Sequence, residues 1–253
     1  MSRKYANPPI IEAVCEFRFT PDSPWDLTIP GLVYEKIGDE FPVKEQRVVQ
    51  QVEIGETEQG LRHQVRASER MWFLTTDRNI FVQLGTHLLA VNSLKPYPTW
   101  ARLKPRIERA FRAVVETVEV TGLERTGLRY INRIEIPGEF EKPDDYQIDF
   151  DQYFEFRPHL GHNLPQTMTD FIVGSVLDVG KPGDRCRVQL TNAVRDRPNV
   201  AAFILDLDYF LAEREAVAVD RALEWVENAH QQVEAIFEGC VSDRLRAIFG
   251  EEK

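Results

Sequence analysis

The sequence has no long apolar run, few cysteines and no surplus of positive charge. Its longest uncharged stretch, Asn79–Leu94, contains several polar residues, whereas a membrane-spanning helix needs about 20 mostly apolar ones. Residues Met1–Pro9 contain no apolar core of the kind found in signal peptides. Three cysteines among 253 residues favour a reducing compartment over a disulfide framework. We therefore expect a cytoplasmic protein without contact to a membrane, and the net charge of −10 excludes a basic coat for nucleic acid.

Motifs of familiar catalytic and cofactor sites are also missing. The chain has no Gly-x-Ser-x-Gly nucleophile elbow, no phosphate-binding loop and no dinucleotide fingerprint. His159 and His162 have the spacing of half a metal site, but no Cys-x-x-Cys or Cys-His pair completes the three or four ligands that zinc needs. The sequence therefore predicts no cofactor and no metal, and it favours a protein that is not an enzyme.

The first half shows the periods of both strands and helices. Apolar and polar residues alternate over Ile10–Phe19, which predicts a strand. Pro30 suits the first turn of a short helix. Antiparallel strands are expected near residues 46–55, 61–67, 70–75, 80–84 and 88–92. A longer helix follows, with Thr99 as its cap and Pro105 either in its first turn or at a kink.

The second half repeats this order of elements. We expect strands near residues 127–136, 170–179, 185–193 and 201–211, then a long helix over 217–239 and a short one over 242–249. Strands that follow one another without helices between them pair antiparallel. The predicted fold is therefore α+β, with two similar halves, residues 1–120 and 121–253, that can form one continuous domain. They would share one curved antiparallel sheet with the long helices packed on one face.

The strands that open the two halves would lie side by side at the centre of such a sheet. Their polar positions would then share one surface, and these are Glu12, Glu16, Arg18, Arg129, Arg133 and Glu135. One interpretation is a ladder of cross-strand ion pairs, each worth about 0.2–1 kcal/mol. The other is a polar floor that binds a ligand or a partner. The even balance of opposite charges favours the ladder, and the polar floor stays as the hypothesis for a binding site.

Charge is distributed unevenly along the chain. Residues 1–125 contain 17 basic and 17 acidic residues, whereas residues 126–253 contain 14 basic and 24 acidic ones. Ten basic residues fall between Arg62 and Arg112, so an alternative function is nucleic-acid binding by phosphate neutralisation. The arginines proposed for that role are Arg66, Arg70, Arg102, Arg106 and Arg109.

His230 interrupts an apolar stripe on the last long helix. Residues such as Val226 and Val233 recur around it at spacings of three and four, which is typical of a helix face buried in a core. We expect a buried histidine whose ring bonds a polar group such as Asn132, because an unpartnered buried imidazole is costly. A second alternative is an unrecognised enzyme in which His230, His159 or His162 acts with carboxylates of the second half.

Two segments carry a resemblance to a known family. Asn7–Phe19, which reads NPPIIEAVCEFRF, and Arg125–Ile134, which reads RTGLRYINRI, resemble the opening and central motifs of a sporadically distributed family of uncharacterised bacterial and archaeal proteins. His230, Phe237 and Ser242–Arg246 are similar to its C-terminal pattern. The resemblance implies no catalytic residue, since no activity is established for the family. Its patchy occurrence is that of genes that travel horizontally, as defence and toxin–antitoxin components do.

Together these features favour a non-catalytic binding or interaction protein. Its expected partner is another protein or a second copy of the chain, and it would serve as an accessory of a mobile defence or toxin–antitoxin locus.

Overall fold

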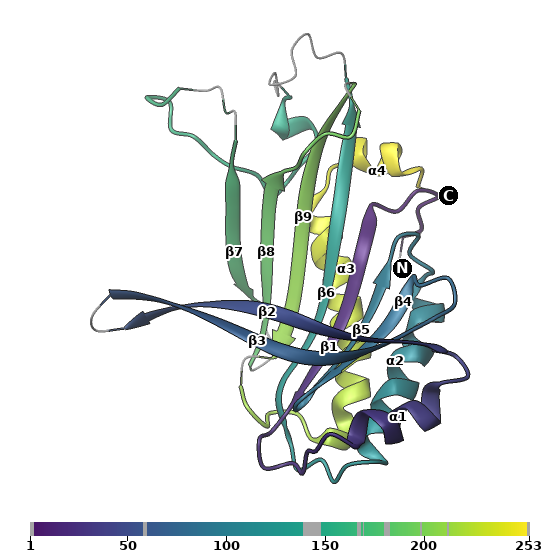
Figure 1. The fold of residues 1–253 in the computed structure, drawn as a ribbon. Helices are drawn as coiled ribbons and strands as arrows, with labels where there is room; N and C mark the ends of the chain where they lie inside the picture. The colour runs from purple at the N-terminus through teal and green to yellow at the C-terminus, as the bar shows by residue number, and fades with distance from the viewer. Residues whose placement is uncertain are drawn as a thin grey trace.

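One antiparallel sheet of nine strands organises the chain, in the order β2-β3-β4-β5-β1-β6-β9-β8-β7 (Figure 1). The computed structural model describes residues 3–57, 60–138, 148–165, 168, 170–179, 183–197, 199–211 and 213–251; of the described residues within 50–67 it gives the backbone alone. The strands are β1 (Ile10–Phe19), β2 (Val43–Thr57), β3 (Gly60–Leu74), β4 (Ile80–Gly85), β5 (Leu88–Leu94), β6 (Leu123–Pro137), β7 (Ile172–Asp178), β8 (Asp184–Asn192) and β9 (Val200–Leu211).

Four α-helices and two short 3-10 helices complete the described part of the fold. They are α1 (Ile29–Ile37), α2 (Trp100–Val115), η1 (Phe150–Gln152), η2 (Val219–Arg221), α3 (Ala222–Cys240) and α4 (Asp243–Phe249). The combination of helices with a purely antiparallel sheet confirms the α+β class. The single sheet runs through both predicted halves without interruption.

Most predicted elements are present, and three local predictions need correction. The strands expected at 61–67 and 70–75 are one strand, β3, because the β2–β3 hairpin extends beyond the core and no apolar face is needed there. α2 starts at Trp100 and continues through Pro105; Thr99 occupies the N-cap position but its side chain makes no capping hydrogen bond. The long helix expected over 217–239 is α3, which begins at Ala222 and ends at Cys240. The short helix expected over 242–249 is α4, and the side chain of Ser242 caps it by accepting a hydrogen bond from the Leu245 amide.

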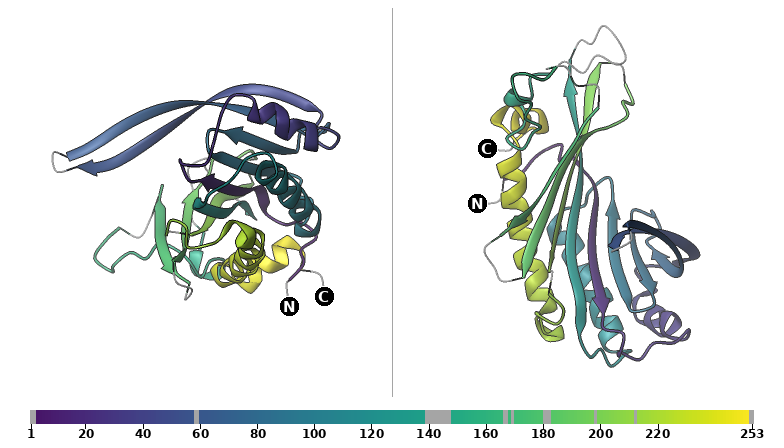
Figure 2. Two further views of the ribbon diagram at one scale, coloured as in Figure 1. Left: turned by 90° about the horizontal axis from the view of Figure 1, so that it is seen from below. Right: turned by 90° about the vertical axis from the view of Figure 1, so that its left-hand side faces the viewer.

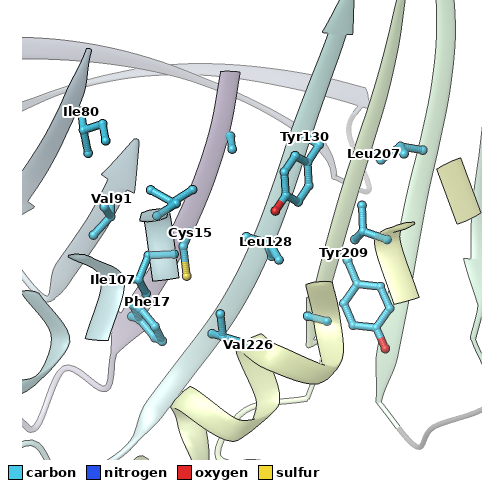
Figure 3. Packing of buried hydrophobic residues seen from close by; sticks show 14 of the residues in the cluster. Cys15, Phe17, Ile80, Val91, Ile107, Leu128, Tyr130, Leu207, Tyr209 and Val226 are labelled. Atoms are coloured by element: carbon cyan, nitrogen blue, oxygen red, sulfur yellow. The ribbon is translucent and has the colours of Figure 1, made fainter. Parts of the chain in front are cut away.

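The two strands that open the halves pair antiparallel at the centre of the sheet, as expected, with Val14 opposite Arg129 and Cys15 opposite Leu128. Alternation along these strands gives the sheet two different faces. We call the side covered by α2 and α3 the helix face, and there Cys15, Phe17 and Leu128 are fully buried (Figure 3). We call the opposite side, which holds the charged residues, the open face.

Helices α2 and α3 both cover the helix face (Figure 2). α2 packs against β5 and α1, and α3 packs against β6 and β9, which confirms that the long terminal helix crosses the back of the second-half strands. The Phe17 and Phe111 rings lie 4.6 Å apart between sheet and α2, and Tyr209 and Trp225 lie 5.6 Å apart between sheet and α3. Aromatic contacts thus join both long helices to the same side of the sheet.

The β2–β3 hairpin forms a projecting arm. It crosses in front of the open face and extends past β7 (Figures 1 and 2). β5 is buried on both of its faces from Leu88 to Ser93. In the second half Arg129 and Arg187 of the open face are exposed. The open face of β6, β9 and β8 is therefore an accessible polar surface of the sheet.

Candidate binding surface on the open face

The six predicted site residues lie on two adjacent strands. Glu12, Glu16 and Arg18 project from β1, and Arg129, Arg133 and Glu135 project from β6, all at positions that alternate with buried core residues. Their cross-strand neighbours differ from the expectation, because the register sets Glu12 beside Ile131 and Glu16 opposite Gly127. The surface is therefore shared as predicted, but most of its ion pairs involve residues that sequence reasoning did not select.

Arg125 of β6 is the main link across the centre of this surface. Its guanidinium donates to Glu16 of β1 at 2.7 Å and to both carboxylate oxygens of Asp208 on β9 at 3.1 and 3.2 Å. The Glu16 carboxylate also accepts from Arg18 at 2.9 Å, and the Arg125 guanidinium lies 5.2 Å from the centre of the Phe210 ring. One side chain thus joins three neighbouring strands through charge-assisted bonds, which are stronger than neutral ones.

Gly127 makes room for this arrangement. A Cβ atom at position 127 would lie 2.9 Å from the Nη1 atom of Arg125 and 3.3 Å from its Cζ atom. A glycine inside a strand commonly marks such a close approach. The Arg125 side chain therefore occupies the space that a side chain at position 127 would take.

Gly127→Val should cost about 1 kcal/mol of folding free energy in the wild type and none in an Arg125→Ala background, where valine favours the strand. In the wild type the new side chain displaces the Arg125 guanidinium from Glu16 and Asp208. Urea unfolding of both single variants and the double variant measures this coupling. Equal costs of Gly127→Val in the two backgrounds would show that glycine is required for a reason other than Arg125.

A second group of ion pairs lies further along β6. Arg129 donates a bidentate pair of hydrogen bonds to the two carboxylate oxygens of Asp206 on β9. These bonds raise the pKa of the guanidinium. Arg133 bonds Glu135 and Asp196, each at 3.0 Å. Burial would raise the pKa of Glu135, but hydrogen bonds from Arg197 and Arg133 outweigh it and lower that pKa. Glu135 therefore stays ionised as the partner of Arg133 and Arg197.

A chain of neutral polar groups extends the surface into the first half. Asn92 of β5 donates to Glu12 at 2.7 Å and accepts from Gln83 of β4 at 2.7 Å. Gln83 in turn accepts from Arg70 of β3 at 3.2 Å. Asn92 and Gln83 are buried, so these bonds satisfy polar groups beneath the arm. Burial lowers the pKa of Arg70, opposed by the nearby Glu16 carboxylate.

The resulting surface is a mosaic of paired charges and apolar side chains. Val14, Ile131 and Phe210 are half-buried between the charged residues. Ion pairs between strands are present on this face, but they join Arg125 to Glu16 and Asp208 and Arg129 to Asp206 rather than the predicted β1 residues to the predicted β6 residues. Among the described residues these pairs leave few uncompensated cations for a phosphate backbone. A broad surface of both signs with interspersed apolar groups suits a protein partner of complementary charge pattern.

Sequence reasoning missed Arg125, Asp206 and Asp208 as members of the surface. The signal for the two aspartates was present, since Asp206 and Asp208 alternate with buried residues and therefore share one strand face. The local sequence does not show that β9 lies beside β6, because the two strands are far apart in the chain. The paired residues Arg125 and Asp208, for example, are 83 positions apart.

The arginines proposed for nucleic-acid binding do not form one surface among the described side chains. Arg70 lies on the open face beside Gln83, whereas Arg106 and Arg109 of α2 pair with Glu40 beyond the end of α1. Arg102 is exposed on α2, and the Arg66 side chain lies outside the described residues. The ion pairs with Glu40 lower the net positive charge at α2. The structure therefore favours nucleic-acid binding less strongly than the count of basic residues in the sequence does.

His230 is buried, with 8% of its surface exposed. Its Nδ1 atom lies 3.1 Å from the Tyr130 hydroxyl, and its ring stacks on Trp100 with centroids 4.1 Å apart. The expected partner Asn132 instead donates to the Leu205 carbonyl, because Tyr130 on the same strand face reaches the helix. Burial lowers the pKa of His230 to about 4, so the ring is neutral near pH 7.

The remaining candidate groups are dispersed. His159 and His162 are exposed in the segment after η1. No three His, Cys, Asp or Glu side chains of the described residues are placed to hold a metal ion, and no helix in this part of the chain is long and apolar enough to cross a membrane. Cys186 and Cys240 are buried, and burial raises the pKa of both thiols to about 12.

A surface depression lined by charged residues lies on the helix side of the sheet, opposite the open face. It runs between α1 and α2 and is lined by Lys36, Pro105, Glu108, Arg109, Arg112, Ala113 and Glu116. None of the three candidate histidines lines it. This depression therefore offers no histidine to the enzyme alternative.

Comparisons with known proteins add no assignment. No protein-family model matches the chain, and no curated protein is significantly similar to it.

Proposed function

We propose that the protein is a non-catalytic binding protein that engages a protein partner through the open face of β6, β9 and β8. The observation that carries this proposal is the accessible mosaic of paired charges around Arg129 and Arg187, whose side chains are 46% and 56% exposed. The projecting arm supports it, since the arm stands on the same side of the sheet (Figure 2). A partner seated on this face would contact both.

The partner is proposed to be encoded by the same locus. The resemblance of Asn7–Phe19 and Arg125–Ile134 to a sporadically distributed family supports an accessory role in a mobile defence or toxin–antitoxin system. Co-expression of the neighbouring genes with the tagged protein is therefore the starting point of the test.

A charge-reversal variant tests the binding surface. Arg129→Glu with Arg187→Glu should reduce recovery of the co-purifying protein about tenfold or more, because like charges across an interface are costly. Arg112→Glu on α2, whose side chain is 63% exposed, is the matched control and should leave recovery unchanged. Circular dichroism checks that both variants fold.

A photo-crosslinking amino acid at Gln189, on the open face of β8, identifies the bound molecule directly. A crosslink to a protein, absent when the crosslinker is placed at position 112, supports the proposal. Full retention of the partner by the charge-reversal variant contradicts it. So does co-purification that nuclease abolishes, which would support the nucleic-acid alternative.

We further propose that the two halves are copies of one ancestral unit. The strand order is β1-β5-β4-β3-β2 outward on one side of the centre and β6-β9-β8-β7 on the other, so the first half has one strand more. Each half thus places its last meander strand beside its opening strand, and each has a long helix after the meander. Separate expression of residues 1–120 and 121–253 tests this: association of the two fragments into a folded complex supports two complementary units.

A further inference from the structure

The two edges of the sheet differ in how they are protected. β2 forms one edge, and its described side chains include Lys44, Glu45 and Arg47. β7 forms the other edge, and its residues from Ile172 to Leu177 include no charge and no proline. Charges and prolines on an edge strand prevent pairing with other chains. β7 therefore has none of these protective features over six consecutive residues.

Large apolar side chains of β7 are exposed to solvent. Ile172 and Val176 are 70% and 53% exposed on the open face, and Leu177 is 37% exposed on the helix face. β7 pairs with β8 on one side, and no strand of the described residues pairs with its other side. An unprotected edge with exposed apolar side chains is the geometry used for strand addition.

We propose that β7 pairs antiparallel with β7 of a second copy of this chain, with a twofold axis at Gly174. This register sets Ile172 opposite the partner's Val176, and Val176 opposite the partner's Ile172. A shift by two residues would set Ile172 opposite the partner's Asp178 instead. The second copy is thus the occupant that covers the exposed apolar residues of both strands at once.

The projecting arm supports the same occupant. A twofold axis perpendicular to the sheet keeps the open faces of both copies on one side. The arm extends past β7 on that side (Figures 1 and 2), so each arm would reach toward the open face of the other copy. The dimer does not depend on the protein partner proposed above, since β7 and the surface around Arg129 are different parts of the sheet.

Light scattering coupled to size-exclusion chromatography tests the oligomeric state of the full chain. The wild type should have twice the 29.3 kDa mass of the monomer. Ile172→Lys with Val176→Lys should weaken dimerisation about tenfold or more, because like charges then oppose each other across the axis. Val194→Lys is the matched control, since Val194 is also apolar and 83% exposed, and it should remain dimeric.

A cysteine at the axis tests the register. Gly174→Cys places its Cβ 3.6 Å from the Val188 carbonyl oxygen, an ordinary contact. Opposed residues of an antiparallel pair lie about 4.5–5.5 Å apart at Cα, within the range of a disulfide. Oxidation should therefore crosslink Gly174→Cys to a covalent dimer faster than Ser175→Cys, while the three native cysteines are buried.

A wild type that stays monomeric at every concentration overturns the proposal, as does a dimer that persists in the double lysine variant. Faster crosslinking of Ser175→Cys than of Gly174→Cys overturns the register. Because these outcomes leave capture of another protein by the open face unaffected, the dimer and the proposed function fail separately.

Discussion

Replacement of Asp184 by alanine is expected to lower the free energy of unfolding by about 3–5 kcal/mol. Asp184 is 4% exposed at the start of β8. One of its carboxylate oxygens accepts from the Tyr209 hydroxyl of β9 at 2.8 Å, and the other accepts from the Trp225 indole of α3 at 2.9 Å. The Asp184 carboxylate thus links α3 to strands β8 and β9 through two hydrogen bonds.

The size of the effect follows from the two donors that alanine would leave unsatisfied. Tyr209 is fully buried and Trp225 is 8% exposed, so water cannot easily replace the lost acceptor. Each unsatisfied buried donor costs about 1–3 kcal/mol, and more where the lost partner is charged. The sum is a large share of the stability of an ordinary domain, about 5–15 kcal/mol.

Urea unfolding followed by circular dichroism measures the effect, and Asp178→Ala is the matched control. Asp178 is an aspartate of the exposed strand β7 whose side chain is 70% exposed and whose ion pair with Arg185 spans 3.4 Å. An exposed ion pair contributes about 0–1 kcal/mol, so this control should unfold close to the wild type. An unchanged midpoint of urea unfolding for Asp184→Ala would contradict the proposal that this carboxylate stabilises the contact between α3 and the sheet.

The second large effect is a pH-dependent loss of stability caused by His230. Its pKa is lowered by burial from 6.5 to about 4 in the folded protein. Glu227 on the same helix opposes this shift, and Lys104 of α2 adds to it. Glu234 lies 3.4 Å from the Nε2 atom, and the Tyr130 hydroxyl faces the Nδ1 atom.

The sign follows from proton binding in the two states. Between pH 6.5 and about 4 the unfolded chain binds a proton at His230 that the folded chain does not bind. Protonation of His230 in the unfolded chain therefore does not lower the free energy of unfolding above pH 6.5, and it lowers this free energy progressively as the pH falls toward 4. The full shift corresponds to about 3 kcal/mol.

The difference between wild type and His230→Leu isolates this contribution, because the carboxylates titrate in both proteins. The free energy of unfolding of the wild type, taken relative to that of His230→Leu, should fall by about 3 kcal/mol between neutral pH and pH 4. Chemical unfolding of both proteins at a series of pH values measures it. A difference that stays constant over this pH range would contradict a buried neutral ring.

Local periodicity in the sequence determined most elements and their faces. β1 has the predicted bounds, Ile10–Phe19, because the alternation of core-facing and outward-facing residues over these ten positions fits a strand and not a helix. The same alternation assigned Cys15 and Phe17 to the core and Glu12 and Glu16 to the other face. The absence of helices between successive strands predicted an antiparallel sheet. These properties depend on residues close in the chain, which is why they are readable without a structure.

The tertiary structure alone decided which distant groups meet. Tyr130 rather than Asn132 bonds His230, Asp208 rather than a β1 residue receives two of the Arg125 bonds, and Glu40 pairs with Arg109. Each choice depends on the register of neighbouring strands or the docking of a helix, and a shift of two residues leaves the apolar pattern of a strand intact. The pattern therefore fixes the face on which a side chain lies, whereas packing of the whole sheet selects its partner.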